Sequence, residues 1–395
     1  MEFKKELDKK TIQLAELGIA FTPSTPVTSI DFFVRRLGEI EEITQSIAES
    51  GAHPVLYGER GVGKTSLANF IRTALSQSHE LLTVKISCNQ SDNTSEIWNK
   101  IFTEITNIVD DYDPQMTLPD PDEIVSPINY IIQALEKLHK PILIIIDEFD
   151  NIKDNVTQIQ LADTIKALSD YIPYITILIV GVADNINDLI GSHASLQRCL
   201  KQIKLGRMSP EELQQIIEKG LSRIELTIEE EVKDDIIKFS QGFPHYVHSL
   251  AKLSAREAIK KSLEKITREC FDVAVNEAIK KADASLSTFY QKAITTNRNQ
   301  DGFRNVLWAC TLVKEDENGT FRAIDIEEFL PKIANRKIKQ QSYSYNLGML
   351  CREQKGAVLE KVGESSNQTR YRFKNPLLKA YIKLIIYQQE TANFS

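Results

Sequence analysis

A glycine-rich stretch near residue 60 constrains the fold of this chain more than any other feature. Its sequence is VLYGERGVGKTSLANF, from Val55 to Phe70, and it fits G-x-x-x-x-G-K-[ST] at every fixed position. An apolar run precedes the glycines and a stretch with helical spacing follows them, as this motif requires. Glycines let backbone N–H groups turn inward around phosphate oxygens, and the start of a helix adds its positive dipole end. The sequence therefore predicts a phosphate-binding loop between a strand and a helix.

The same loop predicts that ATP and Mg²⁺ are the cofactors. Lys64 is expected to reach the β- and γ-phosphates, and Thr65 is expected to bind Mg²⁺. A glycine turn without a ligand is the other explanation of such a motif, but the strand and helix on either side favour a nucleotide site. The residues expected to surround the nucleotide are Gly58, Glu59, Arg60, Gly61, Val62, Gly63, Lys64, Thr65 and Ser66.

Acidic residues after a second apolar run complete the expected catalytic site. The run ILIIIDEFD places Asp147 and Glu148 at the end of a predicted buried strand. Asp147 is expected to bind Mg²⁺ through water, and Glu148 to act as the general base on the attacking water. Acids also follow buried strands where a chain simply leaves the core, so this assignment depends on the phosphate loop upstream. After the next apolar run, Asp184 is expected to contact the γ-phosphate in preference to Asn185, although helix capping explains either residue equally well.

Length and hydrophobic patterning predict the domain organisation. With 395 residues the chain is too long for one ordinary core, and its 42% hydrophobic and 26% charged residues are typical of globular proteins. Between residues 29 and 207, fully apolar runs alternate with amphipathic helices, which indicates an α/β fold: a P-loop NTPase core with a parallel sheet covered on both faces. An N-terminal helix and approach segment over residues 1–28 precede this core. The pattern is helical only over 208–295, and over 296–395 it consists of three helices, a hairpin and a helix.

Composition gives expectations about location and partners. No window approaches the ~20 consecutive apolar residues of a bilayer span, and the first residues lack the apolar core of a signal peptide, so we expect a cytoplasmic protein without a membrane partner. The five cysteines form no C-x-x-C pair, which favours reduced and mostly buried thiols. The formal net charge is -7, yet between Arg336 and Lys383 eleven lysines and arginines accompany three acids. This local excess favours a surface that faces a polyanion.

These motifs resemble those of the AAA+ ATPases, in particular the branch that contains the origin-recognition initiators and the STAND signalling ATPases. The resemblance covers most of the chain and implies Mg²⁺-dependent ATP hydrolysis, a nucleotide-driven conformational switch and a homo-oligomer. The stretch FFVRRLGEIEEI is similar to the family's F-V-G-R-x-x-E-[IL] box, which implies adenine contacts from Phe33, Val34 and Arg36. Arg35 stands where the family more often has glycine.

The resemblance also implies contributions from a neighbouring subunit and from a helical lid. The segment SHASLQRCLKQIKLGRMSPEEL looks like the one that carries an arginine finger, so Arg198, with Arg207 as second choice, is expected to reach a neighbour's γ-phosphate. An arginine at such a place is more often a surface charge. Residues 208–295 look like a lid, and their stretch FSQGFPHYVHSLAK resembles a G-x-P motif that implies a contact of Pro244 with the base. A plain helix junction at Gly242 and Pro244 is the other interpretation.

Residues 296–395 look like a winged helix, with a recognition helix from Ser342 to Glu353 and a wing whose tip is Glu364 to Gln368. In a complex with duplex DNA, side chains of the recognition helix face base edges and cations meet phosphates. STAND proteins use the same fold to contact protein, so a protein effector is the other expected partner. The residues expected to face bases are Gln341, Tyr343, Ser344 and Asn346, and those expected to meet phosphates are Arg336, Lys337, Lys339, Arg370, Arg372 and Lys374.

Three functions remain open on this basis. In the first, ATP drives a conformational change or assembly, and the C-terminal domain acts on duplex DNA. In the second, the chain is a signalling or defence ATPase whose C-terminal domain contacts protein. In the third, the chain binds ATP without turnover. DNA affinity that falls steeply with salt favours the first function, and a turnover rate that Glu148→Gln leaves unchanged favours the third.

Overall fold

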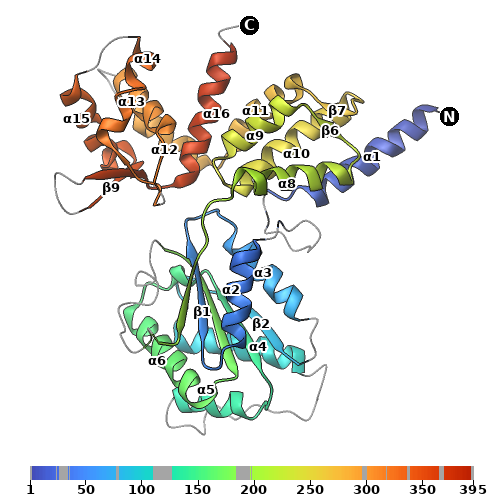
Figure 1. Cartoon of the computed structure of the whole chain (residues 1–395), viewed down its shortest axis with the longest axis vertical. Coiled ribbons are helices and arrows are strands. Elements are labelled where there is room, and N and C mark those ends of the chain that lie inside the picture. The colour runs from blue at the N-terminus through green and yellow to red at the C-terminus, as the bar shows by residue number, and fades with distance from the viewer. Residues whose placement is uncertain are drawn as a thin grey trace. The chain divides into compact units, whose positions relative to one another are not determined.

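The chain divides into two compact units. The computed structural model describes residues 2–23, 25, 34, 36–76, 80–109, 127–183, 196, 198–295, 300–316, 318–335, 339–363 and 369–392. One unit comprises Thr25–Arg207, and the other combines Met1–Ser24 with Met208–Ser395. The N-terminal helix, α1 (Glu2–Ala20), therefore belongs with the helices that follow the core and not with the core itself (Figure 1).

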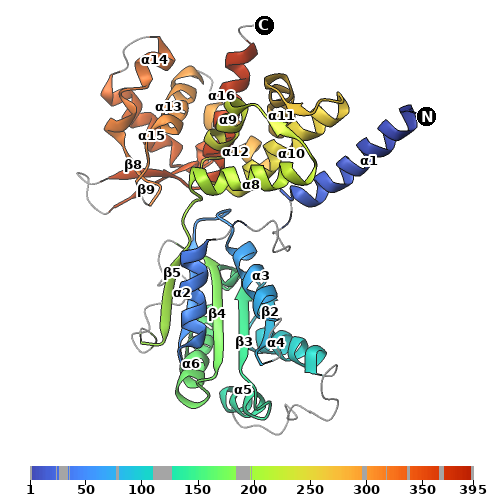
Figure 2. The same cartoon turned by 45° about the vertical axis from the view of Figure 1, so that its right-hand side comes forward.

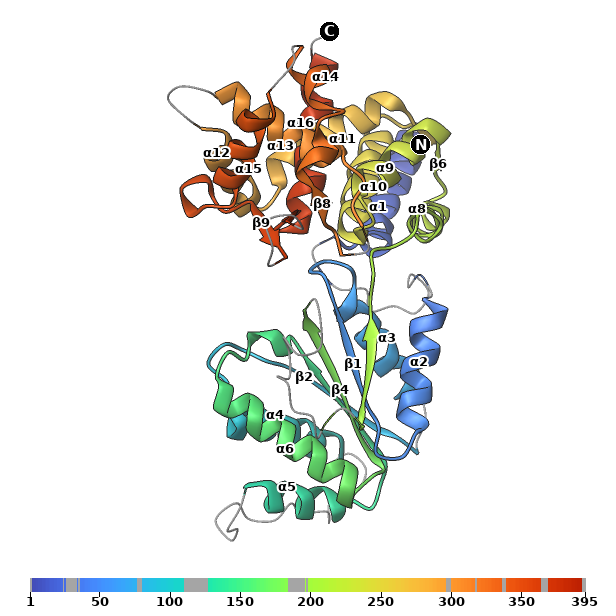
Figure 3. The same ribbon diagram turned by 60° about the vertical axis from the view of Figure 1, so that its left-hand side comes forward.

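A five-stranded sheet forms the centre of the unit from Thr25 to Arg207. Its strand order is β2-β3-β4-β1-β5, and each neighbouring pair runs parallel. Figure 3 shows α2 and α3 on one face of the sheet and α4, α5 and α6 on the other. The strands are β1 (His53–Gly58), β2 (Leu82–Ser87), β3 (Ile142–Asp147), β4 (Ile175–Val182) and β5 (Leu200–Lys204). The helices are α2 (Leu37–Ala48), α3 (Lys64–Leu75), α4 (Thr94–Val109), α5 (Pro127–Glu136) and α6 (Asn155–Tyr171).

The apolar strands explain this architecture. All six residues of β3 are buried, and β4 is buried over its first seven residues. Strands that are covered on both faces have no solvent side, so apolar residues follow one another without polar alternation. The main core cluster joins β2, β3 and β4 to α4, α5 and α6. The predicted parallel sheet with helices on both faces is confirmed.

A buried histidine begins β1. The side chain of His53 has an exposed fraction of 0%, and its Nδ1 accepts a hydrogen bond of 3.0 Å from the backbone N–H of Ile177. Burial lowers the pKa of His53 from 6.5 to about 4, although a hydrogen bond with the backbone of Ile165 opposes this shift. His53 is therefore neutral in the folded unit at neutral pH.

We expect this unit to lose stability as the pH falls from 6.5 towards 4. In that window the unfolded chain binds a proton at His53 and the folded unit does not, which favours unfolding by up to about 3 kcal/mol. Above pH 6.5 the full stability is present.

Urea unfolding between about pH 7 and about pH 4 should show a shallower pH dependence of the free energy of unfolding for His53→Gln than for wild type. His248 of the other unit also has its pKa lowered to about 4 by burial, but it is present in both proteins. Equal pH dependence in the two proteins would contradict the assignment.

The second unit begins with a helical layer that includes the N-terminal helix. Leu17, Ala20 and Phe21 of the α1 segment are buried against α8 and α10. A Cβ added to Gly220 of α8 would lie 2.2 Å from the ring of Phe21, so only glycine lets the two helices approach this closely. Figure 2 shows α8, α10 and α1 side by side. The elements of this layer are α8 (Pro210–Arg223), β6 (Thr227–Ile228), α9 (Glu230–Ser240), α10 (Pro244–Lys260), β7 (Lys265–Ile266) and α11 (Arg268–Lys281).

The C-terminal part of this unit has the element order expected of a winged helix. A hairpin of β9 and β10 carries the short strand β8 on its free edge, and the long helix α16 follows it. Tyr387 of α16 packs edge-on against Phe239 and Phe271, which joins this part to α9 and α11. The elements are α12 (Ala284–Ile294), α13 (Gln300–Leu312), β8 (Phe321–Arg322), α14 (Leu330–Ala334), α15 (Gln340–Leu350), β9 (Leu359–Val362), β10 (Arg370–Phe373) and α16 (Pro376–Ala392).

Two further expectations from the sequence concern membrane-spanning helices and cysteines. None of the helices in the described part of the chain combines the length and the apolar character that a bilayer span requires. All five cysteines are free thiols; four are buried and Cys351 is half-buried.

Candidate functional site

The glycine-rich loop lies between β1 and α3, as expected. Gly58, Gly61 and Gly63 have φ angles of 151°, 88° and 102°. Residues with a Cβ rarely adopt these angles, so the three glycines allow the loop to turn its amides inward before α3 begins at Lys64. Val62 is fully buried, which anchors the middle of the loop, and Arg60 is exposed.

The segment that leaves β5 packs closely against this loop. A Cβ added to Gly58 would lie 2.3 Å from the carbonyl oxygen of Leu205, and the Leu205 N–H donates to the carbonyl oxygen of Tyr57 at 2.7 Å. Arg207 makes a two-pronged ion pair with Glu59, with Nε–Oε2 and Nη2–Oε1 distances of 2.7 and 3.1 Å. The phosphate loop and the last residues of the core are therefore held together by backbone and side-chain contacts.

Lys64 lies inside the loop. Its Nζ donates to the carbonyl oxygens of Gly58 and Glu59 at 3.0 and 2.8 Å, and the residue is 7% exposed. Burial lowers the pKa of Lys64 to about 8, while the nearby carboxylates of Asp150, Asp147 and Glu59 oppose this shift. The loop carbonyl oxygens thus hold the ammonium group inside the loop that the motif predicts to bind phosphates.

Asp147 lies beside the loop, because β1 and β3 are parallel and their carboxyl ends share one edge of the sheet. Asp147 is 2% exposed, and its Oδ1 accepts hydrogen bonds from Thr65 Oγ1 at 3.3 Å and from the Glu148 N–H at 2.9 Å. Glu148 is exposed and has a left-handed backbone, with φ of 56°. The structure therefore brings together Lys64, Thr65, Asp147 and Glu148.

The donors around Asp147 fit Mg²⁺. Among the described residues, no group of three or more His, Cys, Asp or Glu side chains is arranged to hold a metal ion alone. Mg²⁺ prefers oxygen ligands and usually binds through one or two carboxylates together with substrate phosphates. Thr65 and Asp147 supply such oxygens next to the phosphate loop, so they fit the metal that the motif implies.

Two residues near this edge were not anticipated from the sequence. Asp150 Oδ1 accepts a hydrogen bond from the Val182 N–H at 2.8 Å, which ties the segment after β3 to the end of β4. Lys85 of β2 places its Nζ 2.9 Å from Asp147 Oδ2. A lysine in the middle of the strand LTVKIS is the signal that could have revealed it, because charged residues are rare in strands that are buried on both faces.

Arg198 lies far from the loop of its own chain. It lies two residues before β5, whose first residue pairs with His53 at the start of β1, whereas the loop follows the other end of β1. The Arg198 side chain is 66% exposed and forms an ion pair with Asp170. Arg198 therefore lies near the end of β1 opposite the glycine-rich loop of its own chain, whereas Arg207 contacts that loop.

Other predicted nucleotide contacts stay predictions. Phe33, Asp184 and Asn185 lie outside the described residues. Val34 is 3% exposed, and Arg36 donates from Nη1 to the carbonyl oxygen of Gly206 at 2.8 Å. Pro244 is the first residue of α10, and Gly242 before it has φ of 83°.

The exposed face of α15 differs from the predicted one. Tyr343 and Asn346 are 1% and 6% exposed; the Tyr343 hydroxyl donates to Glu327, and Asn346 Nδ2 donates to the Gly302 carbonyl oxygen at 3.1 Å. The expectation that these two residues face bases is wrong, because their spacing places them on the face that packs into the domain. Gln341, Ser344 and Tyr345 are exposed instead, and Tyr345 is 64% exposed.

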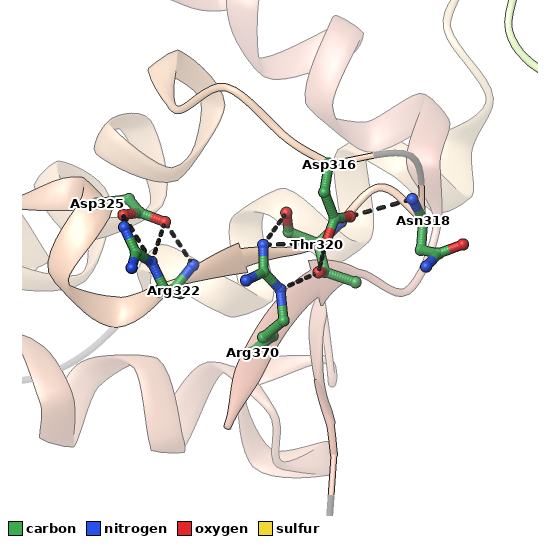
Figure 4. Close-up of polar contacts among 6 residues, drawn as sticks. All are labelled: Asp316, Asn318, Thr320, Arg322, Asp325 and Arg370. Carbon is green, nitrogen blue, oxygen red and sulfur yellow. Dashed lines mark hydrogen bonds and ion pairs between the residues drawn. The ribbon is translucent and has the colours of Figure 1, made fainter. Parts of the chain in front are cut away.

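Several predicted phosphate contacts are engaged within the C-terminal part. Arg370 donates to Thr320 and lies 2.9 Å from Asp316 Oδ2, as Figure 4 shows for the residues around Thr320. Arg372 pairs with Glu360, and Lys374 Nζ lies 4.0 Å from Glu353 Oε1. Arg336, Lys337 and the wing tip Glu364–Gln368 lie outside the described residues. Lys339, Arg352 and Lys361 are exposed, and the described part of the chain offers them no ion pair.

Comparisons with known proteins agree with this geometry. Residues 48–190 match the family model described as AAA domain. A curated relative, "ORC1-type DNA replication protein 2" of Haloarcula marismortui, is 25% identical over 219 residues, which are 52% of this chain. The match spans 50% of that relative's length.

Solved structures show the same fold. A Walker-type ATPase of Pyrococcus abyssi superposes with a TM-score of 0.55 at 14% identity, over 91% of this chain and 99% of the other. The ORC2 protein of Aeropyrum pernix, solved as ADPNP-ADP complexes, superposes with a TM-score of 0.51 at 15% identity, over 96% and 98%. The solved structures show the fold, a P-loop NTPase fold, and residues 48–190 are similar to an AAA domain, so the predicted resemblance to AAA+ ATPases related to the origin-recognition initiators is confirmed.

Proposed function

We propose that the protein is a Mg²⁺-dependent AAA+ ATPase that changes conformation or assembles with nucleotide state and acts on duplex DNA through its C-terminal part. The observation that carries this proposal is the arrangement of Lys64, Thr65, Asp147 and Glu148 around one loop. The AAA domain match supports nucleotide use, and the replication-protein relative supports action on DNA. A cytoplasmic location and a homo-oligomer are part of the same proposal.

Each residue of the site has a separate role in this mechanism. The loop amides and Lys64 bind and orient the phosphates, so that the γ-phosphorus lies in line with a water molecule. Glu148 is exposed beside Asp147, where it orients that water and accepts its proton. Thr65 and Asp147 would hold Mg²⁺, which when bound supplies positive charge against the phosphate oxygens. Hydrolysis needs no covalent intermediate, because positioning and electrostatic stabilisation suffice.

Arg198 is proposed to complete the site of a neighbouring subunit. Its long side chain is mostly exposed and pairs with Asp170, near the end of β1 opposite the loop of its own chain. A surface ion pair of this kind contributes little stability, so the guanidinium can exchange Asp170 for a phosphate at low cost. Asp184 is proposed to contact the γ-phosphate, and Phe33, Val34, Arg36 and Pro244 to contact the base.

The exposed side of α15 is the proposed DNA-reading surface. Gln341 and Ser344 offer hydrogen-bonding groups to base edges, and Tyr345 offers an aromatic surface. Lys339 precedes the helix and Arg352 follows it, while Lys361 lies on β9. These three exposed cations are better candidates for phosphate contacts than Arg370 and Arg372, whose charges are offset by Asp316 and Glu360.

Charge reversal at single cations tests this surface. Lys339→Glu, Arg352→Glu and Lys361→Glu should each weaken duplex binding, and each should reduce the slope of log affinity against log salt by about 1. Fluorescence anisotropy of a labelled duplex between about 50 and about 200 mM salt measures both quantities. Lys265→Glu, which changes an exposed lysine of β7, is the matched control and should behave as wild type. Equal slopes in all four variants and wild type would remove α15 from the DNA interface.

A signalling ATPase that contacts protein is the second candidate function. Two observations favour it. Arg370 and Arg372 of β10 form ion pairs with acidic residues, and Tyr345 is 64% exposed. Mass measurement of the particle with ATP, with and without duplex DNA, separates the two candidates. A complex that contains DNA supports the first, and assembly that ignores DNA supports the second.

A further inference from the structure

A lysine of β2 lies beside the carboxylate that is expected to bind the metal. The Lys85 side chain is 11% exposed, and its Nζ lies 2.9 Å from Asp147 Oδ2, whose side chain is 3% exposed. The same Nζ donates to Asn69 Oδ1 on α3 at 2.6 Å. Elements from three places in the sequence, α3, β2 and β3, therefore meet at this ammonium group.

The two oxygens of Asp147 face different partners. Oδ1 accepts from Thr65 Oγ1 at 3.3 Å and from the Glu148 N–H at 2.9 Å, so it points toward the phosphate loop. Oδ2 lies against Lys85, and the contact is an ion pair, since its angles are not those of a hydrogen bond. A carboxylate held at both oxygens cannot rotate freely, and its loop-facing oxygen is fixed in direction.

Burial makes this contact important. A carboxylate removed from water is stabilised only if a cation or hydrogen-bond donors compensate for the lost hydration. Lys85 supplies that cation on the side of Asp147 away from the loop, and Asn69 fixes the position of the ammonium group. Groups that orient a metal ligand from behind in this way typically change metal affinity by about 10–100-fold when removed.

We propose that Lys85 is a positioning residue for the metal site: it holds Oδ2 of Asp147 so that Oδ1 faces Thr65 and the metal ion that accompanies ATP. This inference rests on the proposed function and deepens it. Lys85 touches neither the phosphates nor the water, and it acts only through Asp147. Its removal should therefore affect metal-dependent nucleotide binding and leave metal-free binding by the loop unchanged.

The experiment compares ATP affinity with EDTA and over a Mg²⁺ titration, by calorimetry, on the full chain. In Lys85→Met, the Mg²⁺ concentration that gives half of the metal-dependent increase in ATP affinity should rise by about 10–100-fold. The ATP affinity in EDTA should stay unchanged. Lys85→Gln keeps a hydrogen-bond donor without the charge and should show a smaller rise. Lys201→Met is the matched control, because Lys201 is a strand lysine whose Nζ lies 2.8 Å from Glu49 Oε1 at the surface. It should behave as wild type.

Each outcome decides the question. An unchanged Mg²⁺ requirement in Lys85→Met overturns the inference, and so does a lower requirement, which would mean that the ammonium charge merely repels the metal. An equal loss of affinity in EDTA and in Mg²⁺ indicates a purely structural role and also overturns it. If Lys85→Met does not fold, as judged by its unfolding transition, Lys85→Gln carries the test. Failure of the proposed function is distinct, because wild type would then bind no ATP under either condition.

Discussion

Replacing Glu148 by glutamine is expected to lower phosphate release by about 10²–10⁴-fold while ATP still binds. The substitution keeps the size and the hydrogen-bonding shape of the side chain but removes the group that accepts a proton from water. Glu148 follows Asp147 directly, and its N–H donates to Asp147 Oδ1. The backbone at the proposed general base is therefore held by the carboxylate that is expected to bind the metal.

Steady-state phosphate release and equilibrium ATP binding, measured on the same preparation, check this expectation. The matched control is Glu136→Gln, which changes an exposed glutamate at the end of α5 and should leave both quantities unchanged. A variant that releases phosphate at the wild-type rate would exclude Glu148 as the base. No release by wild type itself, with intact ATP binding, would favour a protein that binds ATP without turnover.

Replacing Lys64 by alanine is expected to weaken ATP binding by more than about 100-fold. The ammonium group now donates to the Gly58 and Glu59 carbonyl oxygens within the loop, and it is 7% exposed. Phosphate oxygens would offer it charged acceptors in the same surroundings, and each such hydrogen bond contributes about 1.5–3 kcal/mol. Removal of two of them corresponds to about 3 to 6 kcal/mol, or more than two decades of affinity.

Calorimetric titration with ATP measures this loss. The substitution also removes a buried charge, so the unfolding transition of Lys64→Ala has to be compared with that of wild type. Unchanged ATP affinity in a folded Lys64→Ala protein would contradict the nucleotide site altogether, including the roles proposed for Thr65, Asp147 and Lys85.

The local parts of the fold and site could be predicted because they depend on short-range sequence patterns. The phosphate loop needs glycines at fixed spacing, and Asp147 directly follows an apolar run, so both could be identified and placed at one edge of a parallel sheet. The prediction of which α15 residues are exposed was wrong because it depended on long-range contacts. Tyr343 and Asn346 are polar and look suited to solvent, but contacts with Glu327 and the Gly302 backbone, distant in sequence, satisfy them inside the domain.

The ion pairs that form on folding could likewise not be predicted from the sequence. Net charge counts treat Arg370 and Arg372 as free cations, whereas folding places Asp316 and Glu360 beside them. The pairing of Lys85 with Asp147 requires two strands to be neighbours, and the sequence does not state the strand order. The close packing of the α1 segment on α8 involves Gly220 and the ring of Phe21. The sequence does not indicate that these two residues are in contact.

The close contact between Gly58 and Leu205 has a mechanical consequence. The loop at one end of β1 and the peptide that leaves β5 touch without an intervening side chain, and the Glu59–Arg207 pair adds a second link a few residues away. If the loop shifts on binding phosphates, as the proposed function expects, this backbone contact would displace the chain at Leu205. The junction would then pass a small local displacement of the loop to the backbone that follows β5.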